Sequence, residues 1–209
     1  RLFALSERLR AARLAGDDQL DSTVVNFYFA EQKRQYFAGR EQWDSTLFWN
    51  AAALHQAEQV LNQSKESALW QGKWLDAVLN QTYFLLFQTD RDTARLSEAI
   101  RYAQAAERYP DEGAFYYENR YLLQTNLAHA LWLRQKPGDR ELALQHYRQF
   151  LQNNLSTYDP WELLLKDFRD LARAGVKWPD MAGLIQQIRP ADGAITDDDW
   201  AELGIRPPG

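Results

Sequence analysis

Cysteine is absent from the 209-residue sequence, which excludes disulfides, thiolate metal ligands and cysteine nucleophiles. Glycine is scarce, with 10 residues, and no P-loop, GxGxxG or GxSxG pattern occurs. The 3 histidines lie in no His-Glu-x-x-His sequence, and none follows a glutamate by three residues. The zinc-protease and di-iron bundle patterns are therefore missing. We predict no catalytic residue, no metal site and no cofactor.

Excess positive charge and long apolar runs are missing too. The net charge is -5 and the pI is near 5.3, whereas nucleic-acid binding requires many lysines and arginines to neutralise phosphates. No stretch approaches the roughly 18 apolar residues that a membrane-spanning helix needs. With 45% hydrophobic and 25% charged residues, the composition is that of a folded, soluble domain.

The beginning of the sequence permits two interpretations. It opens at Arg1 and carries further basic residues at Arg8, Arg10 and Arg13. One interpretation is an amphipathic first helix with a solvated basic face, which we favour. The other is a juxtamembrane stub, as expected for the extracytoplasmic part of a membrane-anchored bacterial protein. For the location of the domain we favour the extracytoplasmic side of such a membrane-anchored protein, and a cytoplasmic location is the alternative.

Apolar residues recur at helical spacing along almost the whole chain. Leu47, Leu54 and Leu61, for example, fall on one stripe of a helix with 3.6 residues per turn. No segment alternates with a period of two residues between turns, so the predicted fold class is all-α. Residues 24–29 have a strand-like composition, but they lie between a cap-like Asp-Ser pair and a polar segment. We therefore predict a buried helix there.

Polar, glycine and proline residues mark the ends of the helices. Asp159 followed by Pro160 and Glu162 is a strong helix start, because Asp caps free amides, Pro fits the first turn and Glu favours the positive helix end. Short links favour antiparallel hairpins. We expect one all-helical domain over 1–189 and an acidic, proline-rich tail over 190–209. The expected helices span 2–15, 22–38, 42–63, 67–88, 93–109, 114–136, 140–154, 161–174 and 179–189, with a short one at 197–203.

The acidic run Asp197-Asp198-Asp199 suggests either a metal site or a helix start. Its spacing does not suit a calcium loop. Thr196 and Asp199 instead have the spacing of a capping box, so we predict that this run opens the short C-terminal helix.

Two helices repeat the same spacing of small and large residues, with a shift of 44 residues. Small residues at such positions let the second helix of a hairpin approach the first closely, and an aromatic residue fills the gap to the next pair. The aligned residues are Ala99, Ala103 and Ala106 in the first helix and Ala143, Tyr147 and Phe150 in the second.

The pattern over roughly 93–174 resembles the tetratricopeptide repeat, a helix–turn–helix unit of 34 residues. Tyr147 stands at the position where that family has an aromatic residue, whereas Ala103 replaces the aromatic in the preceding hairpin. In the same register, the tryptophan of the following repeat falls at Trp161. The resemblance implies a short solenoid of stacked hairpins whose first helices line a concave face. An irregular helical bundle is the alternative.

The resemblance implies a scaffold or interaction module that binds a peptide or helix of a partner protein on its concave face. The alternative for Leu122 and Trp132 is that they pack against the helix at 67–88 and do not contact a partner. A second hypothesis is a carbohydrate-binding or carbohydrate-active domain, suggested by the 8 Trp, 10 Tyr and 10 Phe, with Glu118 and Glu162 as the carboxylates. The residues expected on the concave face are Glu118, Leu122, Thr125, His129, Trp132, Glu162, Lys166 and Arg169.

Overall fold

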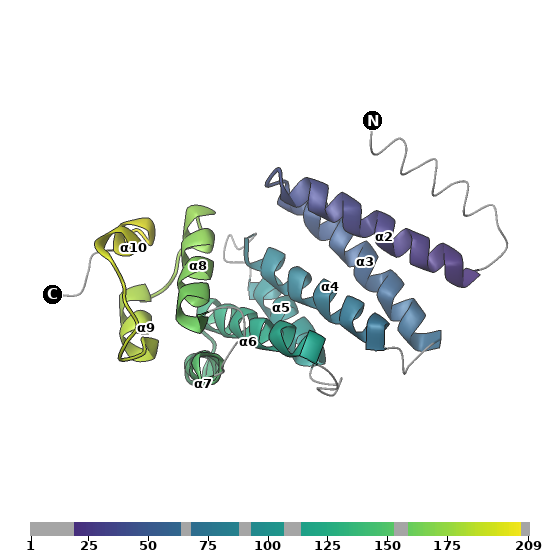
Figure 1. Cartoon of the computed structure of the whole chain (residues 1–209). Coiled ribbons are helices and arrows are strands. Elements are labelled where there is room, and N and C mark those ends of the chain that lie inside the picture. The colour runs from purple at the N-terminus through teal and green to yellow at the C-terminus, as the bar shows by residue number, and fades with distance from the viewer. Residues whose placement is uncertain (1–18, 64–67, 88–92, 107–113, 153–158, 206–209) are drawn as a thin grey trace.

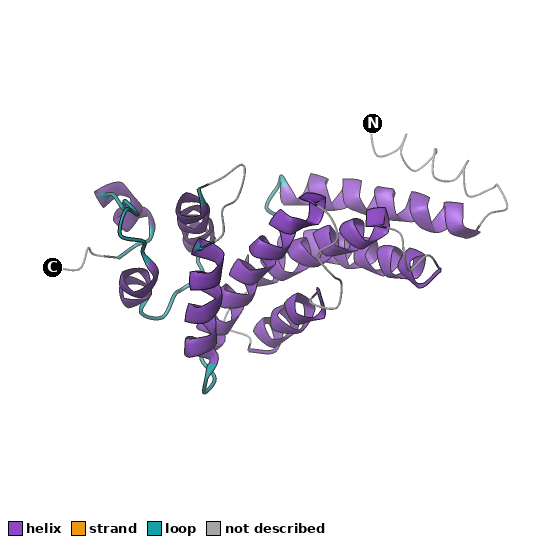
Figure 2. Ribbon diagram, turned by 60° about the horizontal axis from the view of Figure 1, so that its bottom comes forward, coloured by secondary structure: helices purple, strands orange, loops and turns teal. Residues whose placement is uncertain are grey.

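The computed structural model describes residues 19–63, 68–87, 93–106, 114–152 and 159–205. Within these ranges the regular structure is helical and no strand occurs, so the all-α prediction is confirmed (Figure 2). The helices are α2 (Gln19–Ala38), α3 (Trp43–Gln63), α4 (Ala68–Phe87), α5 (Thr93–Ala105), α6 (Ala114–Arg134), α7 (Asp139–Leu151), α8 (Pro160–Arg173), α9 (Met181–Ile188) and α10 (Asp197–Glu202). The expected helix at 2–15 lies outside the described residues.

The helices from α2 to α7 follow one another in space as they do along the chain, whereas α9 packs against α7 and α10 packs against α8. Each pair of successive helices from α2 to α7 packs together, and α4 also packs against α6. Figure 1 shows α2 and α3 at one end of the molecule and α9 and α10 at the other. Among the described residues, no helix combines the length and the hydropathy needed to cross a bilayer.

The strand-like run at 24–29 lies within α2, as predicted. Phe27 is almost completely buried, and its ring lies edge-on to Trp70 of α4 with 5.1 Å between centroids. Phe29 makes the same kind of contact with Trp49 of α3 at 5.6 Å. These residues have only a low intrinsic preference for helix. The helix forms because their large side chains pack against the neighbouring helices.

Two buried amide side chains fix the register between helices near the middle of the chain. Asn50 of α3 donates to Oε1 of Gln81 on α4 at 2.8 Å. Asn126 of α6 donates to Oγ1 of Thr82 on α4 at 3.0 Å. Because an unpaired polar group in the core is costly, these bonds favour one alignment of α3, α4 and α6 over shifted ones.

The predicted start of α8 is confirmed. The helix begins at Pro160, and the carboxylate of Asp159 accepts hydrogen bonds from the backbone amides of Trp161 at 2.7 Å and Glu162 at 3.3 Å. This geometry satisfies two of the amides that lack partners in the first helical turn.

Within the segment expected to be a C-terminal tail, the described residues 190–205 pack against α8. The indole of Trp161 donates to the carbonyl of Ala194 at 2.7 Å, and Trp200 and Leu203 are buried. The predicted capping box is present: Thr196 accepts from the backbone amide of Asp199, and the Asp199 carboxylate accepts from the backbone amide of Thr196.

Candidate functional site

The residues that define the 44-residue alignment all face the interior. Both triplets are buried, and the members of the second triplet have no exposed surface at all. α5 and α7, the two helices that carry these residues, both pack against α6. The aligned residues are Ala99, Ala103, Ala106, Ala143, Tyr147 and Phe150.

Three residues of the expected concave stripe lie in the core. Thr125 is 1% exposed, His129 is 0% exposed and Trp132 is 2% exposed. The indole of Trp132 donates to the carbonyl of Pro179, in the loop between α8 and α9, at 2.7 Å. This loop therefore covers the face of α6 that the sequence pattern assigned to a binding groove.

His129 is surrounded by side chains from the helices and loops after α6. Its Nδ1 atom lies 2.7 Å from the hydroxyl oxygen of Tyr147 on α7. Its ring contacts those of Phe168 and Trp178, each with 5.2 Å between centroids. Its Nε2 atom is 3.7 Å from a carboxylate oxygen of Asp167. Burial, together with the nearby Asp167 charge, raises the pKa of Tyr147 well above its ordinary value, so this phenol stays protonated.

The other expected residues do not complete a continuous open face. Leu122 is partly buried against the core, and the side chain of Glu118 lies outside the described part of α6. Glu162 and Lys166 are exposed on α8, where Lys166 pairs with Asp170. Arg169 pairs with Asp199 and lies 3.7 Å from Glu202, so it holds α10 against α8.

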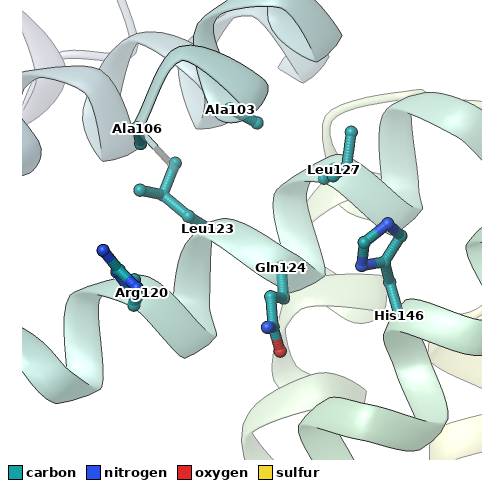
Figure 3. Close-up of a pocket in the computed structure, with 7 residues that line it drawn as sticks. All are labelled: Ala103, Ala106, Arg120, Leu123, Gln124, Leu127 and His146. Carbon is teal, nitrogen blue, oxygen red and sulfur yellow. The ribbon is translucent and has the colours of Figure 1, made fainter. Parts of the chain in front are cut away.

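A cleft of about 240 Å³ lies where α5, α6 and α7 meet (Figure 3). We call it the Ala103 cleft. Four of its lining residues are apolar and buried, while the polar ones come from α6 and α7. The lining residues are Ala103, Ala106, Arg120, Leu123, Gln124, Leu127 and His146.

The cleft borders a position where the two aligned helices differ. Ala103 lies four residues after Ala99, as Tyr147 lies four residues after Ala143. On α7 the tyrosine ring is completely buried, whereas on α5 the corresponding side chain is a single methyl group. The sequence signal for the cleft is therefore a small residue, Ala103, at the position that aligns with Tyr147, and this signal by itself does not indicate a cavity.

The polar side of the cleft contains an unpaired acceptor. The Oε1 atom of Gln124 is buried and accepts no hydrogen bond from the described residues. Arg120, one helical turn before Gln124, supplies a positive charge, and His146 contributes an imidazole from α7 (Figure 3). An apolar floor with a few polar groups at one side is typical of sites that bind a ligand.

A second, shallower hollow of about 630 Å³ lies beside the α2–α3 turn. Trp43 and Phe87 stack there with 4.6 Å between ring centroids. The carboxylates of Glu41 and Asp44 are exposed at its edge. Glu162 does not line it. In the described part of the chain, no group of three or more His, Asp or Glu side chains is arranged to hold a metal ion.

Comparison of the chain with models of protein families, with curated proteins and with solved structures finds no match. Function must therefore be inferred from the residues and the geometry of the chain itself.

Proposed function

We propose that this chain is a protein-interaction module of stacked helix hairpins that binds a segment of a partner protein in the Ala103 cleft. The observation that carries the proposal is the cleft itself, about 240 Å³ with an apolar floor at the junction of three helices. Ligand sites in proteins are concave and mostly apolar, with a few polar groups, and the cleft has these features.

The size and lining of the cleft favour a peptide segment. Its volume suits one large side chain, which would leave the rest of the segment on the surface beside α5 and α7. Binding energy at protein interfaces is concentrated in a few anchors of this kind, each inserted into a desolvated pocket. Arg120, Gln124 and His146 would supply hydrogen bonds to the polar groups next to the anchor.

The proposal keeps the function that the tetratricopeptide-like pattern implies but moves its site. Burial of Thr125, His129 and Trp132 supports a binding surface other than the concave stripe of α6. The carbohydrate hypothesis has less support. Glu41 and Asp44 line the hollow beside the α2–α3 turn, but the rings of Trp43 and Phe87 there stack on each other, so the stacked faces are not open to a sugar.

A peptide selection tests the proposal. Random peptides displayed on phage are selected on the immobilised intact chain, and the affinity of the selected peptides is measured by fluorescence anisotropy. Ala103→Met, which places a flexible side chain in the cleft, is expected to weaken binding by about tenfold or more. Ala201→Met, at an exposed position of α10, is the matched control and should bind as the parent does.

The proposal fails if the selected peptides bind Ala103→Met as tightly as the parent. Unfolding by denaturant, measured on both variants, establishes that any loss of binding comes from a folded protein.

A further inference from the structure

The occupied counterpart of the Ala103 cleft lies in the same molecule, one hairpin further along the chain. There Tyr147 has no exposed surface, and its ring lies 5.9 Å from that of Phe168 on α8, the residue 44 positions after Gln124 of the cleft. Its hydroxyl pairs with Nδ1 of His129 at 2.7 Å. The second hairpin thus accommodates an aromatic ring, with its polar atom hydrogen-bonded, at the position that aligns with Ala103.

The dimensions of the Ala103 cleft fit such a ring. A cavity of roughly 150 Å³ lined by apolar side chains is enough to bind benzene in an engineered protein. The Ala103 cleft has about 240 Å³ and presents the methyl groups of Ala103, Ala106, Leu123 and Leu127. An aromatic side chain gains much contact area there while losing little rotamer freedom.

The polar side of the cleft favours a ring that carries a hydrogen-bond donor. Gln124 Oε1 is buried without a donor from the described residues, which is an unfavourable state for a carbonyl oxygen. The terminal torsion of a glutamine is broad, so rotation about it allows Oε1 to turn toward a group that enters the cleft. The hydroxyl of tyrosine and the N–H of tryptophan are donors, whereas phenylalanine has none.

We infer that the Ala103 cleft receives a tyrosine or tryptophan side chain of a partner peptide, with its O–H or N–H donating to Gln124 Oε1. This inference rests on the proposed function, since it names the anchor by which the partner segment binds. The incoming ring lies beside Ala103 of α5 and Gln124 of α6, as the ring of Tyr147 on α7 lies beside Phe168 of α8.

Small aromatic probes test the anchor without any peptide. p-Cresol and toluene differ by one hydroxyl group, and their binding to the intact chain is followed through the NMR shifts of the Ala103, Leu123 and Leu127 methyl groups. p-Cresol is expected to bind about tenfold more tightly than toluene, because only it satisfies the buried acceptor. Gln124→Met, which keeps a similar length and removes the acceptor, should reduce this ratio to about one.

A second test of the inference measures peptide binding. In the selected peptides, replacing the aromatic anchor by leucine is expected to weaken binding to the parent chain by about tenfold or more, and replacing tyrosine by phenylalanine by a smaller factor. Ala103→Tyr, which fills the cleft from within, should abolish binding of both probes. Because the comparison of p-cresol with toluene uses the parent chain, it stands even if this variant does not fold.

Two results would overturn the inference while leaving the proposed function intact. One is peptide binding that is weakened by Ala103→Met but unaffected when leucine replaces the aromatic anchor. The other is equal affinity for toluene and p-cresol. By contrast, peptide binding that is insensitive to Ala103→Met defeats the proposed function, whatever the probes do.

Discussion

Ala103 and Tyr147 each lie four residues after a buried alanine, on two helices that pack against α6, yet only Tyr147 fills the space beside it. The difference separates a closed hairpin from one that retains a cleft of about 240 Å³. The filled space around Tyr147 can be tested by measuring stability, and the cleft beside Ala103 can be tested by measuring binding.

On the closed side, Tyr147→Phe should destabilise the protein by about 1–3 kcal/mol, because it leaves Nδ1 of the fully buried His129 without its partner at 2.7 Å. The free energy of unfolding in urea is the measurement. Tyr28→Phe, at a side chain that is 43% exposed, is the control and should change it little. Equal stability of Tyr147→Phe and the parent would show that the hydroxyl is not needed.

Ala143 of α7 has 0% exposed surface. Ala143→Leu should therefore overpack the hairpin and lower the free energy of unfolding by about 1–3 kcal/mol. Ala51→Leu makes the same change at an exposed position of α3 and should be nearly neutral. If both variants unfold at the parent's urea concentration, the alignment of Ala99 with Ala143 does not describe how the hairpins pack.

We expect Trp132 to contribute to the stability of the fold and not to peptide binding. Removal of this buried indole, which also donates to Pro179, should cost about 3–5 kcal/mol in Trp132→Ala. Leu142→Ala, at a side chain that is 41% exposed, is the control for loss of apolar surface. A Trp132→Ala protein with the parent's stability and no peptide binding would return the binding surface to the stripe on α6.

The Arg134–Asp139 pair at the start of α7 should make a pH-dependent contribution to the free energy of unfolding. Arg134 donates to both carboxylate oxygens of Asp139, at 2.8 and 2.7 Å, and these bonds hold the pKa of Asp139 below its ordinary value. Because the folded pKa is the lower one, the stabilisation is complete above the unfolded pKa of about 3.9 and is lost as the pH falls through the folded value. Asp139→Asn should therefore cost about 2 kcal/mol at pH 7 and progressively less below about pH 4.

Urea unfolding of the parent and Asp139→Asn between pH 7 and the acid limit of the native state measures this difference. Lys166→Gln removes the exposed pair with Asp170 and should change stability by less than about 0.5 kcal/mol. A parent-to-variant difference that stays constant through pH 3 would contradict the role of the Asp139 carboxylate.

The helices could be predicted because their signals are local. Asp159 and Pro160 start α8, and Thr196 with Asp199 starts α10, through contacts within a single turn. The sequence predicts the start of α9 at residue 179, whereas the helix begins two residues later, at Met181. There Asp180 adopts a left-handed conformation, with φ of 50°, and its side chain caps Gly183, which leaves Trp178 and Pro179 in the loop that covers α6.

The candidate site was less predictable, because periodicity shows which residues share a face and not what covers that face. The periodicity puts His129 and Trp132 on one stripe of α6, but Trp178 and Pro179 approach them from a segment more than forty residues later. The Ala103 cleft exists because the small side chain of Ala103 leaves space between α5, α6 and α7 unfilled. Only the packing around Ala103 and Tyr147 shows that the second space is filled and the first is not.

The most direct test of the central claim is an NMR measurement of contacts between the intact chain and a selected peptide. Intermolecular NOEs are recorded between the ring protons of the peptide's tyrosine or tryptophan and the methyl groups of the protein. We predict NOEs to the methyl groups of Ala103, Leu123 and Leu127, which line the cleft. NOEs confined to methyl groups elsewhere, such as those of the exposed Leu69 and Leu142, would contradict the account.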